Sequence, residues 1–274
     1  MRRILLTLIL TAFGMTFANN DLYIVSRSPY TGLDTTIVRI TDLSSITMGQ
    51  VPTAGLIAYY PLNAFSTAAD FLTETSGNNR TAQMVKGTAN SVYGAADRFG
   101  NMYKAIAFFS DSAQYLKVPN CIDGLSALSI SAWFYPDSTN PWRWIFAQSP
   151  NPNFVQVGAA INNSVLRYHF TTGGSGSATH ITDGKIPVTI KQWNHVVVTY
   201  DGTTFKSYVN NLADTTMAIT GTVYAPDSTT IGCGYYGGNK ELFSGYIDDV
   251  RYYNRPLTAA EVNALYLEGG YIPK

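Results

Sequence analysis

The sequence is poor in charged residues. Only 13% of its 274 residues are charged, the 18 acidic residues balance the 18 basic ones, and no basic stripe runs along the chain. Proteins that bind nucleic acid concentrate basic residues, because these displace the counterions of the phosphates. The composition therefore excludes that class of protein.

Long unbranched helix formers are also scarce, and only four of the 18 acidic residues are glutamate. Tyrosine (19 residues), glycine (23) and phenylalanine (13) are abundant instead. Aromatic, β-branched and turn residues favour strands and tight connections, so the composition predicts an all-β protein rather than a helical bundle. Hydrophobic residues make up 46% of the chain, enough for a substantial core, which excludes disorder of the whole.

The longest hydrophobic run lies at the N-terminus, where two arginines precede residues 4–17 and polar residues follow Ala18. The run is shorter than the roughly 20 apolar residues of a membrane-spanning helix. A basic head, an apolar middle and a small residue at the end are typical of a signal peptide. We therefore predict a signal peptide at residues 1–18, an exported protein (secreted, periplasmic or at the cell surface), and no membrane span after cleavage.

The rest of the chain divides into a lead-in segment and one β domain. Residues 19–54 are polar and rich in Thr and Ser, with one strand-like run at 36–40. From residue 55 to 274, short apolar runs alternate with turn residues, which is typical of a sandwich or barrel. Near the end, Thr258 and Glu261 fit a capping box, and Gly269 can end the short helix that they predict. The predicted strands are 56–62, 105–109, 115–118, 128–135, 144–147, 154–161, 165–170, 195–200, 205–209, 230–233 and 246–253.

Four stretches of this domain carry a family resemblance. In chain order they are 55–63 (GLIAYYPLN) with 74–78 (ETSGN), 97–101 (DRFGN) with 128–136 (LSISAWFYP), 192–202 (QWNHVVVTYDG) with 208–210 (YVN), and 243–257 (FSGYIDDVRYYNRPL). The domain resembles the LamG-like jelly-roll domains of the concanavalin A-like lectin/glucanase superfold. That resemblance implies a two-sheet antiparallel jelly-roll sandwich with one short C-terminal helix. It also implies an extracellular binding or adhesive role, often directed at carbohydrate.

The same resemblance implies a structural calcium ion at the rim of the sandwich. The matching positions are Asn63, Glu74 and Asp248, with Asp249 as the alternative to Asp248. Calcium takes six to eight oxygen ligands, and carboxylates and backbone carbonyls can supply them. The acidic pair has another possible role, because it can cap a turn or pair with a nearby arginine.

Paired catalytic carboxylates are missing from the predicted strands. Glycosidases need two carboxylates about 5 to 10 Å apart across a cleft. Asp248 and Asp249 are adjacent in a predicted strand, and neighbouring strand residues point to opposite faces, so we expect one carboxylate on each face. The three histidines lack a metal-binding spacing, and His195 is interpreted as a structural residue. These observations favour a protein that is not an enzyme.

Exposed aromatic residues are candidates for binding sugar rings, because the flat C–H faces of sugars stack on Trp and Tyr. The candidates are Trp142 and Trp144, two residues apart, and Tyr235 and Tyr236 in a loop bounded by glycines. The alternative is that Trp144 and one of the tyrosines pack in the core. Two further tryptophans lie in strand motifs of the resemblance and are assigned to the core: Trp133 and Trp193.

The two cysteines, Cys121 and Cys233, lie near predicted strand ends. An even number of cysteines in an exported protein suggests a disulfide bridge, and two buried thiols are the alternative.

These expectations predict a non-catalytic binding module for a polysaccharide or a cell-surface glycan. The first alternative is a structural or adhesive protein that binds an extracellular protein and has no sugar site. A glycosidase is the third possibility.

Overall fold

The computed structural model describes residues 13–18, 21–27, 34–40, 50–63, 72–85, 93–140, 142–148, 155–174, 177–236 and 239–271. The chain separates into two compact units, Met1–Gln50 and Val51–Lys274. The first unit contains a three-stranded antiparallel sheet formed by β1 (Phe13–Ala18), β2 (Asp21–Arg27) and β3 (Asp34–Ile40). The lead-in segment thus carries two strands where one was expected. Most of the predicted signal peptide, residues 1–12, lies outside the described residues.

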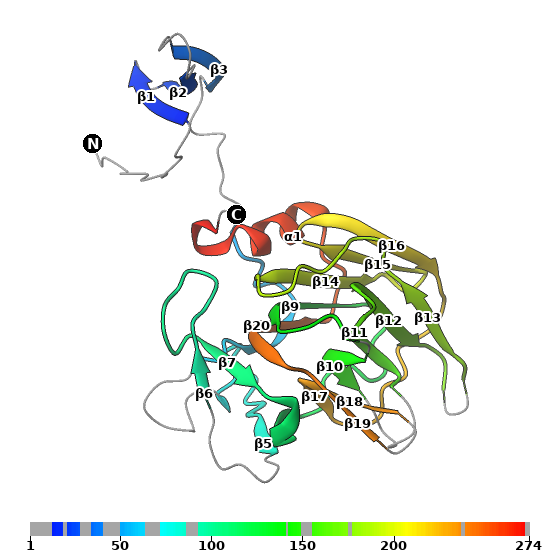
Figure 1. The fold of residues 1–274 in the computed structure, drawn as a ribbon. Coiled ribbons are helices and arrows are strands. Elements are labelled where there is room, and N and C mark those ends of the chain that lie inside the picture. The colour runs from blue at the N-terminus through cyan, green and yellow to red at the C-terminus, as the bar shows by residue number, and fades with distance from the viewer. Residues whose placement is uncertain are drawn as a thin grey trace. The chain divides into compact units, whose positions relative to one another are not determined.

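The second unit is a sandwich of two antiparallel sheets (Figure 1). In spatial order, the seven-stranded sheet contains β13 (Thr179–Asp183), β12 (Val165–Thr171), β11 (Val157–Asn162), β10 (Arg143–Gln148), β17 (Thr229–Ile231), β8 (Tyr115–Val118) and β5 (Gln83–Val85). The eight-stranded sheet contains β16 (Leu212–Ala218), β15 (Thr204–Val209), β14 (Asn194–Tyr200), β9 (Leu128–Pro136), β20 (Gly245–Tyr253), β7 (Ala105–Phe108) and β6 (Tyr93–Ala95), with β4 (Leu56–Tyr60) paired to β20. A separate hairpin joins β18 (Cys233–Tyr236) to β19 (Asn239–Leu242).

The core lies between the two sheets, as the alternation of β9 illustrates. Ile130, Ala132 and Phe134 belong to the large buried cluster between the sheets. Ser131 and Trp133 point to the other side of the eight-stranded sheet, because successive strand residues face opposite ways. This outer face is therefore the place where polar and aromatic side chains of the sheet collect. The jelly-roll sandwich predicted from the sequence is confirmed.

Helix α1 (Ala259–Tyr266) covers one end of that outer face, next to β14 and β16 in Figure 1. The predicted capping box is present, because the Thr258 side chain accepts the backbone N–H of Glu261 and the Glu261 carboxylate accepts that of Thr258. Val262 and Leu265 pack in one buried cluster with Tyr253 of β20. A short 3-10 turn, Glu268–Gly270, follows the helix. Within the described residues, no helix combines the length and the apolar character that crossing a membrane requires.

Both cysteines are free thiols, so the predicted Cys121–Cys233 bridge is wrong. Cys121 packs against the core between the sheets. Cys233 is buried in another cluster, with Tyr115 and Leu242. Burial raises the pKa of each thiol to about 12, so both stay protonated at neutral pH. The sequence alternative of two buried thiols describes Cys233 fully and Cys121 in part, since Cys121 is half-buried.

Candidate functional site

A pocket of about 600 Å³ opens beside helix α1 on the outer face of the eight-stranded sheet. We call it the aromatic pocket, because five of the residues that line it are aromatic. These are Phe99, Tyr135, Trp193, Tyr266 and Tyr271. They come from the β6–β7 loop, the end of β9, the residue before β14, the end of α1 and the segment after it. The pocket is thus assembled from parts of the chain that are far apart in sequence.

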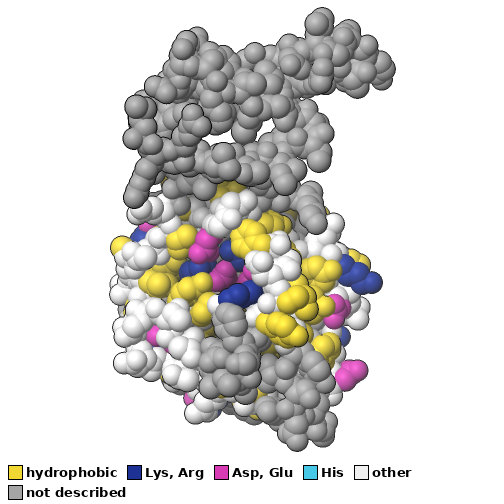
Figure 2. Space-filling view, turned by 90° about the vertical axis from the view of Figure 1, so that its left-hand side faces the viewer, with side chains coloured by type: hydrophobic (Ala, Val, Ile, Leu, Met, Phe, Trp, Pro, Cys, Tyr) yellow, Lys and Arg dark blue, Asp and Glu magenta, His cyan; other side chains and the backbone are white. Residues whose placement is uncertain are grey.

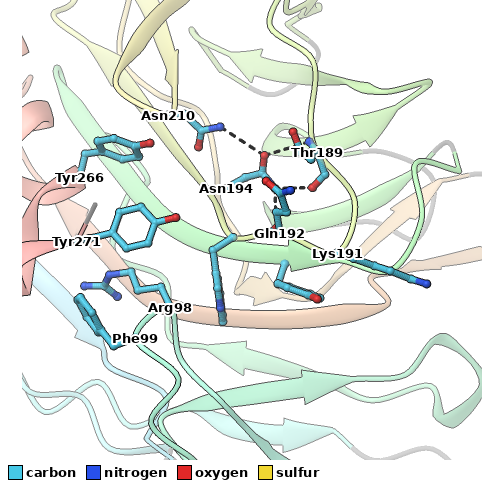
Figure 3. A pocket seen from close by; sticks show the side chains of 11 residues that line it. Arg98, Phe99, Thr189, Lys191, Gln192, Asn194, Asn210, Tyr266 and Tyr271 are labelled. Carbon is cyan, nitrogen blue, oxygen red and sulfur yellow. Dashed lines mark hydrogen bonds between the residues drawn. The ribbon is translucent and has the colours of Figure 1, made fainter. Parts of the chain in front are cut away.

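One wall is formed by the end of the chain. Tyr266 is the last residue of α1, and Gly269 and Gly270 follow with φ of 68° and 79°. Glycine adopts this left-handed backbone without strain, so the chain can turn back at this point. Tyr271 then lies edge-on to Tyr266, with ring centroids 5.7 Å apart. Figure 3 shows the hydroxyl groups of both tyrosines pointing toward the middle of the pocket.

The opposite wall is the loop that leads into β14. The side-chain amide of Asn194 holds this loop by hydrogen bonds. The Asn194 side chain donates to the carbonyls of Thr189 and Gln192, both at 2.8 Å, and accepts the Thr189 N–H at 3.1 Å. Asn210 donates to the same Asn194 side chain at 3.4 Å (Figure 3). These two amides therefore shape the wall, whereas the side chains of Lys191 and Gln192 are exposed at the rim.

Trp133 lies behind the wall formed by Tyr266 and Tyr271, and it is fully buried. Its ring stacks on His195 at 4.7 Å and on Tyr266 at 5.5 Å, and Tyr271 meets it edge-on at 4.7 Å. His195 forms a 2.8 Å hydrogen bond with the Ser131 hydroxyl through Nε2. Burial holds the pKa of His195 well below its usual value, so the ring is neutral. This burial and packing are consistent with the structural interpretation of His195, which stays a prediction.

Arg98 lies next to Trp133. It lines the pocket, and its charged guanidinium is buried beneath the pocket surface. Its Cζ is 4.7 Å from the centroid of Phe99 and 4.8 Å from the ring of Trp133. Its Nη1 donates to Asp249 at 2.6 Å and to Asp248 at 3.4 Å. A guanidinium placed between rings and carboxylates gains both cation–π and charge-assisted hydrogen-bond energy.

The contact of both acids with one arginine corrects a sequence prediction. Asp248 and Asp249 were expected on opposite faces of a regular strand. The register of β20 against β9 shifts between Asp248 and Arg251, and Asp249 adopts φ 50°. Such a bulge breaks the alternation of side chains, so both carboxylates reach the outer face. Burial raises the pKa of Asp248 well above its ordinary value, whereas Arg251 and Arg98 outweigh burial and lower the pKa of Asp249.

A second arginine completes this ionic cluster, which we define as Arg98, Asp248, Asp249, Arg251 and Glu268. Arg251 Nη2 donates to Glu268 at 2.8 Å, and Arg98 Nη2 lies 3.5 Å from the other oxygen of Glu268. The side chains of the two arginines are 3% and 2% exposed. Figure 2 shows acidic and basic side chains gathered in the middle of one face, with hydrophobic side chains around them. The cluster ties the segment after α1 to the sheet.

The predicted sugar-stacking tryptophans lie elsewhere, on the seven-stranded sheet. Trp144 is fully buried, and its indole N–H donates to Glu241 at 2.7 Å. A covered ring cannot stack on a ligand, so the prediction is wrong for Trp144 and its core alternative holds. Trp142 is half-buried; it meets His169 edge-on at 6.4 Å, and the Arg167 guanidinium lies 5.2 Å from its ring. Its role as a sugar platform stays a prediction.

Tyr235, one of the two predicted tyrosines, is not among the described residues that line the aromatic pocket. Tyr235 packs edge-on against Tyr115, and the two hydroxyl groups are hydrogen-bonded at 2.8 Å. The side chain of Tyr236 lies outside the described residues. Trp193, assigned to the core from the sequence, is half-buried and lines the aromatic pocket instead. It meets Tyr135 edge-on at 5.8 Å, so it belongs to an outward-facing aromatic group.

Two of the three residues predicted to hold calcium, Glu74 and Asp248, have other partners. The Glu74 carboxylate accepts the backbone N–H groups of Tyr59 at 2.9 Å, of Asn78 at 3.2 Å and of Ser76. Asp248 accepts the N–H of Asp249 and faces the Arg98 guanidinium. A guanidinium beside a carboxylate and amides on both oxygens do not fit a cation site. No group of three or more His, Cys, Asp or Glu suited to a metal occurs in the described part of the chain. Calcium binding at Asn63, Glu74 and Asp248 stays a prediction.

The comparisons with known proteins agree with this architecture. A model of the concanavalin A-like lectin/glucanases superfamily, Laminin_G_3, matches residues 110–263, more than half of the chain. A search of the curated proteins finds no match.

Three solved structures illustrate the similarity. Domain 4 of AbnA, an extracellular GH43 arabinanase from Geobacillus stearothermophilus, solved with arabinotriose, is 20% identical with a TM-score of 0.59 and covers 78% of this chain and 98% of its own. The binding domain of Paraclostridial Mosquitocidal Protein 1 is 15% identical with a TM-score of 0.59, over 77% and 52%. The binding domain of botulinum neurotoxin DC with SialylT is 14% identical with a TM-score of 0.55, over 78% and 51%.

At these identities the solved structures support the fold alone, and the chain matches only about half of each of the two toxin domains. The family is shown by the match over residues 110–263 together with the two antiparallel sheets and a short C-terminal helix. This chain belongs to the concanavalin A-like lectin/glucanase superfamily.

Proposed function

We propose that the protein is an exported, non-catalytic module that binds a glycan in the aromatic pocket. The observation that carries the proposal is the composition of the pocket. Five aromatic residues line it, and the hydroxyl groups of Tyr266 and Tyr271 point inward. Aromatic faces stack on the C–H faces of sugars, while hydroxyl and amide groups bind sugar hydroxyls. A concave aromatic surface with a few polar groups is the usual form of a small-ligand site.

The relatives support this type of ligand without identifying it. The AbnA domain was solved with arabinotriose and the neurotoxin domain with SialylT, so saccharides bind to proteins of similar fold. Fold similarity at this identity does not transfer a site. The proposal for this chain therefore depends on its own pocket.

The module is proposed to be non-catalytic because the carboxylates of the ionic cluster are buried and paired with arginine. Asp248 and Asp249 both face the outer side of the sheet, so two carboxylates do lie together. Their side chains are only 4% and 11% exposed, and both contact Arg98. A glycosidase needs one free carboxylic acid and one free carboxylate across an open cleft. Carboxylates that are buried against guanidinium groups support a structural role.

One observation favours the alternative function, binding of a protein partner. Three large apolar side chains in the β6–β7 loop are solvent-exposed: Phe99 is 43% exposed, Met102 61% and Tyr103 57%. Apolar side chains that cluster on a surface mark interaction sites. A partner protein that contacts this loop would depend on Met102 and Tyr103, which do not line the aromatic pocket.

A glycan array with the purified protein tests the proposal, with arabinan oligosaccharides and sialylated glycans included. For a bound saccharide, Trp193→Ala and Tyr271→Ala should weaken binding by about 1 to 3 kcal/mol each, by analogy with the loss of an aromatic side chain that stacks on a flat ligand. Trp142→Ala is the matched control on the other sheet. Binding that depends on Trp142 and not on Trp193 would move the site to the seven-stranded sheet. An array without any bound glycan would refute the proposal and favour a protein partner.

A further inference from the structure

Arg98 is the charged residue most deeply built into the aromatic pocket, and its charge is already compensated. Its side chain is 3% exposed. Nη1 donates to Asp249 at 2.6 Å and to Asp248 at 3.4 Å, and Nη2 lies 3.5 Å from Glu268. A guanidinium surrounded by three carboxylates has little remaining attraction for a charged ligand. Attraction of a charged ligand therefore does not account for Arg98, and its position in the pocket must have another role.

The rings around Arg98 supply that explanation. The guanidinium lies against Phe99 at 4.7 Å and against Trp133 at 4.8 Å. Tyr271 touches both of these rings edge-on, with centroid distances of 6.2 Å to Phe99 and 4.7 Å to Trp133. Phe99 and Tyr271 line the pocket, and Trp133 lies behind Tyr271. Arg98 thus lies where Phe99 and the Trp133 ring behind Tyr271 come together.

The ion pairs of Glu268 hold the chain segment that carries Tyr271. Glu268 lies three residues before Tyr271 and on the far side of the two left-handed glycines. Its carboxylate binds Arg251 of β20 at 2.8 Å and lies 3.5 Å from Arg98. Without these contacts, the Gly269–Gly270 pair would leave Tyr271 free to move, because glycine restricts the backbone least. Arg98 is the residue that contacts both this anchor and the aromatic rings.

We propose that Arg98 is a positioning residue of the aromatic pocket: its planar face holds Phe99 and Trp133, the two rings against which Tyr271 packs, and it makes no ionic contact with the bound saccharide. The proposal rests on the glycan-binding function proposed above. Arginine suits this role because its flat guanidinium stacks on rings while its edge binds carboxylates. Lysine keeps the charge but offers no flat face, so the two residues are not interchangeable at this position.

The test compares Arg98→Lys with wild type in titrations with arabinotriose, which is uncharged, and sialyllactose, which is acidic. The matched control is Arg255→Met, which breaks the ion pair of Arg255 with Glu261 at helix α1, outside the pocket lining. We expect Arg98→Lys to weaken each saccharide that binds by about tenfold, the order for loss of an aromatic wall. Arg255→Met should leave these affinities unchanged. Full affinity in Arg98→Lys, or a loss confined to sialyllactose, would overturn the proposal.

A readout without ligand separates this proposal from the proposed function. Near-ultraviolet circular dichroism reports the fixed packing of aromatic rings. Arg98→Lys should reduce that signal, whereas Arg255→Met should not. If wild type binds neither saccharide, the proposed function fails for them, and an unchanged spectrum in Arg98→Lys would overturn the positioning role as well. If Arg98→Lys does not fold, Phe99→Ala removes one stacked ring without touching the ion pairs. An unchanged spectrum in Phe99→Ala would equally overturn the proposal.

Discussion

The contribution of His169 to stability should be lost as the pH drops from 7.5 to 5, because this residue is buried in a neutral state. His169 lies in β12, where its ring packs edge-on against Trp144 at 5.0 Å and Nδ1 lies 3.1 Å from the Val155 carbonyl. Burial lowers its pKa from 6.5 to about 4. Below pH 6.5 the unfolded chain binds a proton that the folded protein does not bind, so stability is complete above that pH and is lost as the pH falls toward 4.

The magnitude follows from that shift. A pKa lowered from 6.5 to about 4 corresponds to about 3 kcal/mol in total, of which about 2 kcal/mol is lost between pH 7.5 and pH 5. His195 is shifted in the same direction, whereas the raised pKa values of Asp248, Glu241 and Glu268 act in the opposite direction, so the difference between a His169 variant and wild type is the quantity to measure. His169→Phe keeps an aromatic ring against Trp144 and cannot be protonated. The variant should therefore lose about 2 kcal/mol less than wild type over the same range.

Urea unfolding followed by tryptophan fluorescence at the two pH values measures these differences. The control is His180→Gln, since the His180 side chain is exposed on the neighbouring strand β13. Its pH dependence should match that of wild type. If His169→Phe and wild type lose the same free energy of unfolding between pH 7.5 and pH 5, the reasoning from burial of His169 is refuted.

Three further predictions concern buried polar groups. Asp214→Asn should lower the free energy of unfolding by about 1 to 3 kcal/mol in urea titrations, because the carboxylate accepts two backbone N–H groups and the Tyr168 hydroxyl; a variant as stable as wild type would contradict this. The thiols of Cys121 and Cys233 should both react with a thiol reagent in unfolded, unreduced protein. If neither reacted, the two cysteines would be bridged after all. Glu74→Gln should lower the melting midpoint equally in calcium and in chelator, because its carboxylate binds backbone amides; a rise with calcium that only wild type shows would instead support the predicted calcium site.

The strands that face the core on one side could be predicted from the sequence. The predicted runs at 115–118, 128–135 and 246–253 coincide with β8, β9 and β20 to within one residue at each end. Their apolar residues recur with the period of a strand, or fill it continuously where both faces are buried. The edge strands β13 and β16 were not predicted. Most of their residues are exposed or half-exposed, so they carry no apolar pattern to recognise.

The pocket was harder to predict, because its residues depend on contacts across the chain. Trp193 was assigned to the core for its place in a strand motif, yet it precedes β14 by one residue and faces outward. Tyr266 and Tyr271 were not singled out, since one ends a helix and the other follows two glycines. Only the observation that α1 covers the outer face of the sheet brings these residues together. The capping box gave the start of that helix, but not the surface on which it packs.

The acidic pair shows how one backbone angle determines the character of the site. In a regular strand, one of Asp248 and Asp249 would point into the core beside Val250, where an unpaired carboxylate costs several kcal/mol. The left-handed Asp249 forms a bulge instead, and both carboxylates reach the outer face. There Arg98 binds both of them, so neither the acids nor the arginine remain available to a ligand. Apart from Lys191 at its rim, the aromatic pocket therefore offers rings, hydroxyl groups and amides, which suits a ligand recognised mainly by stacking.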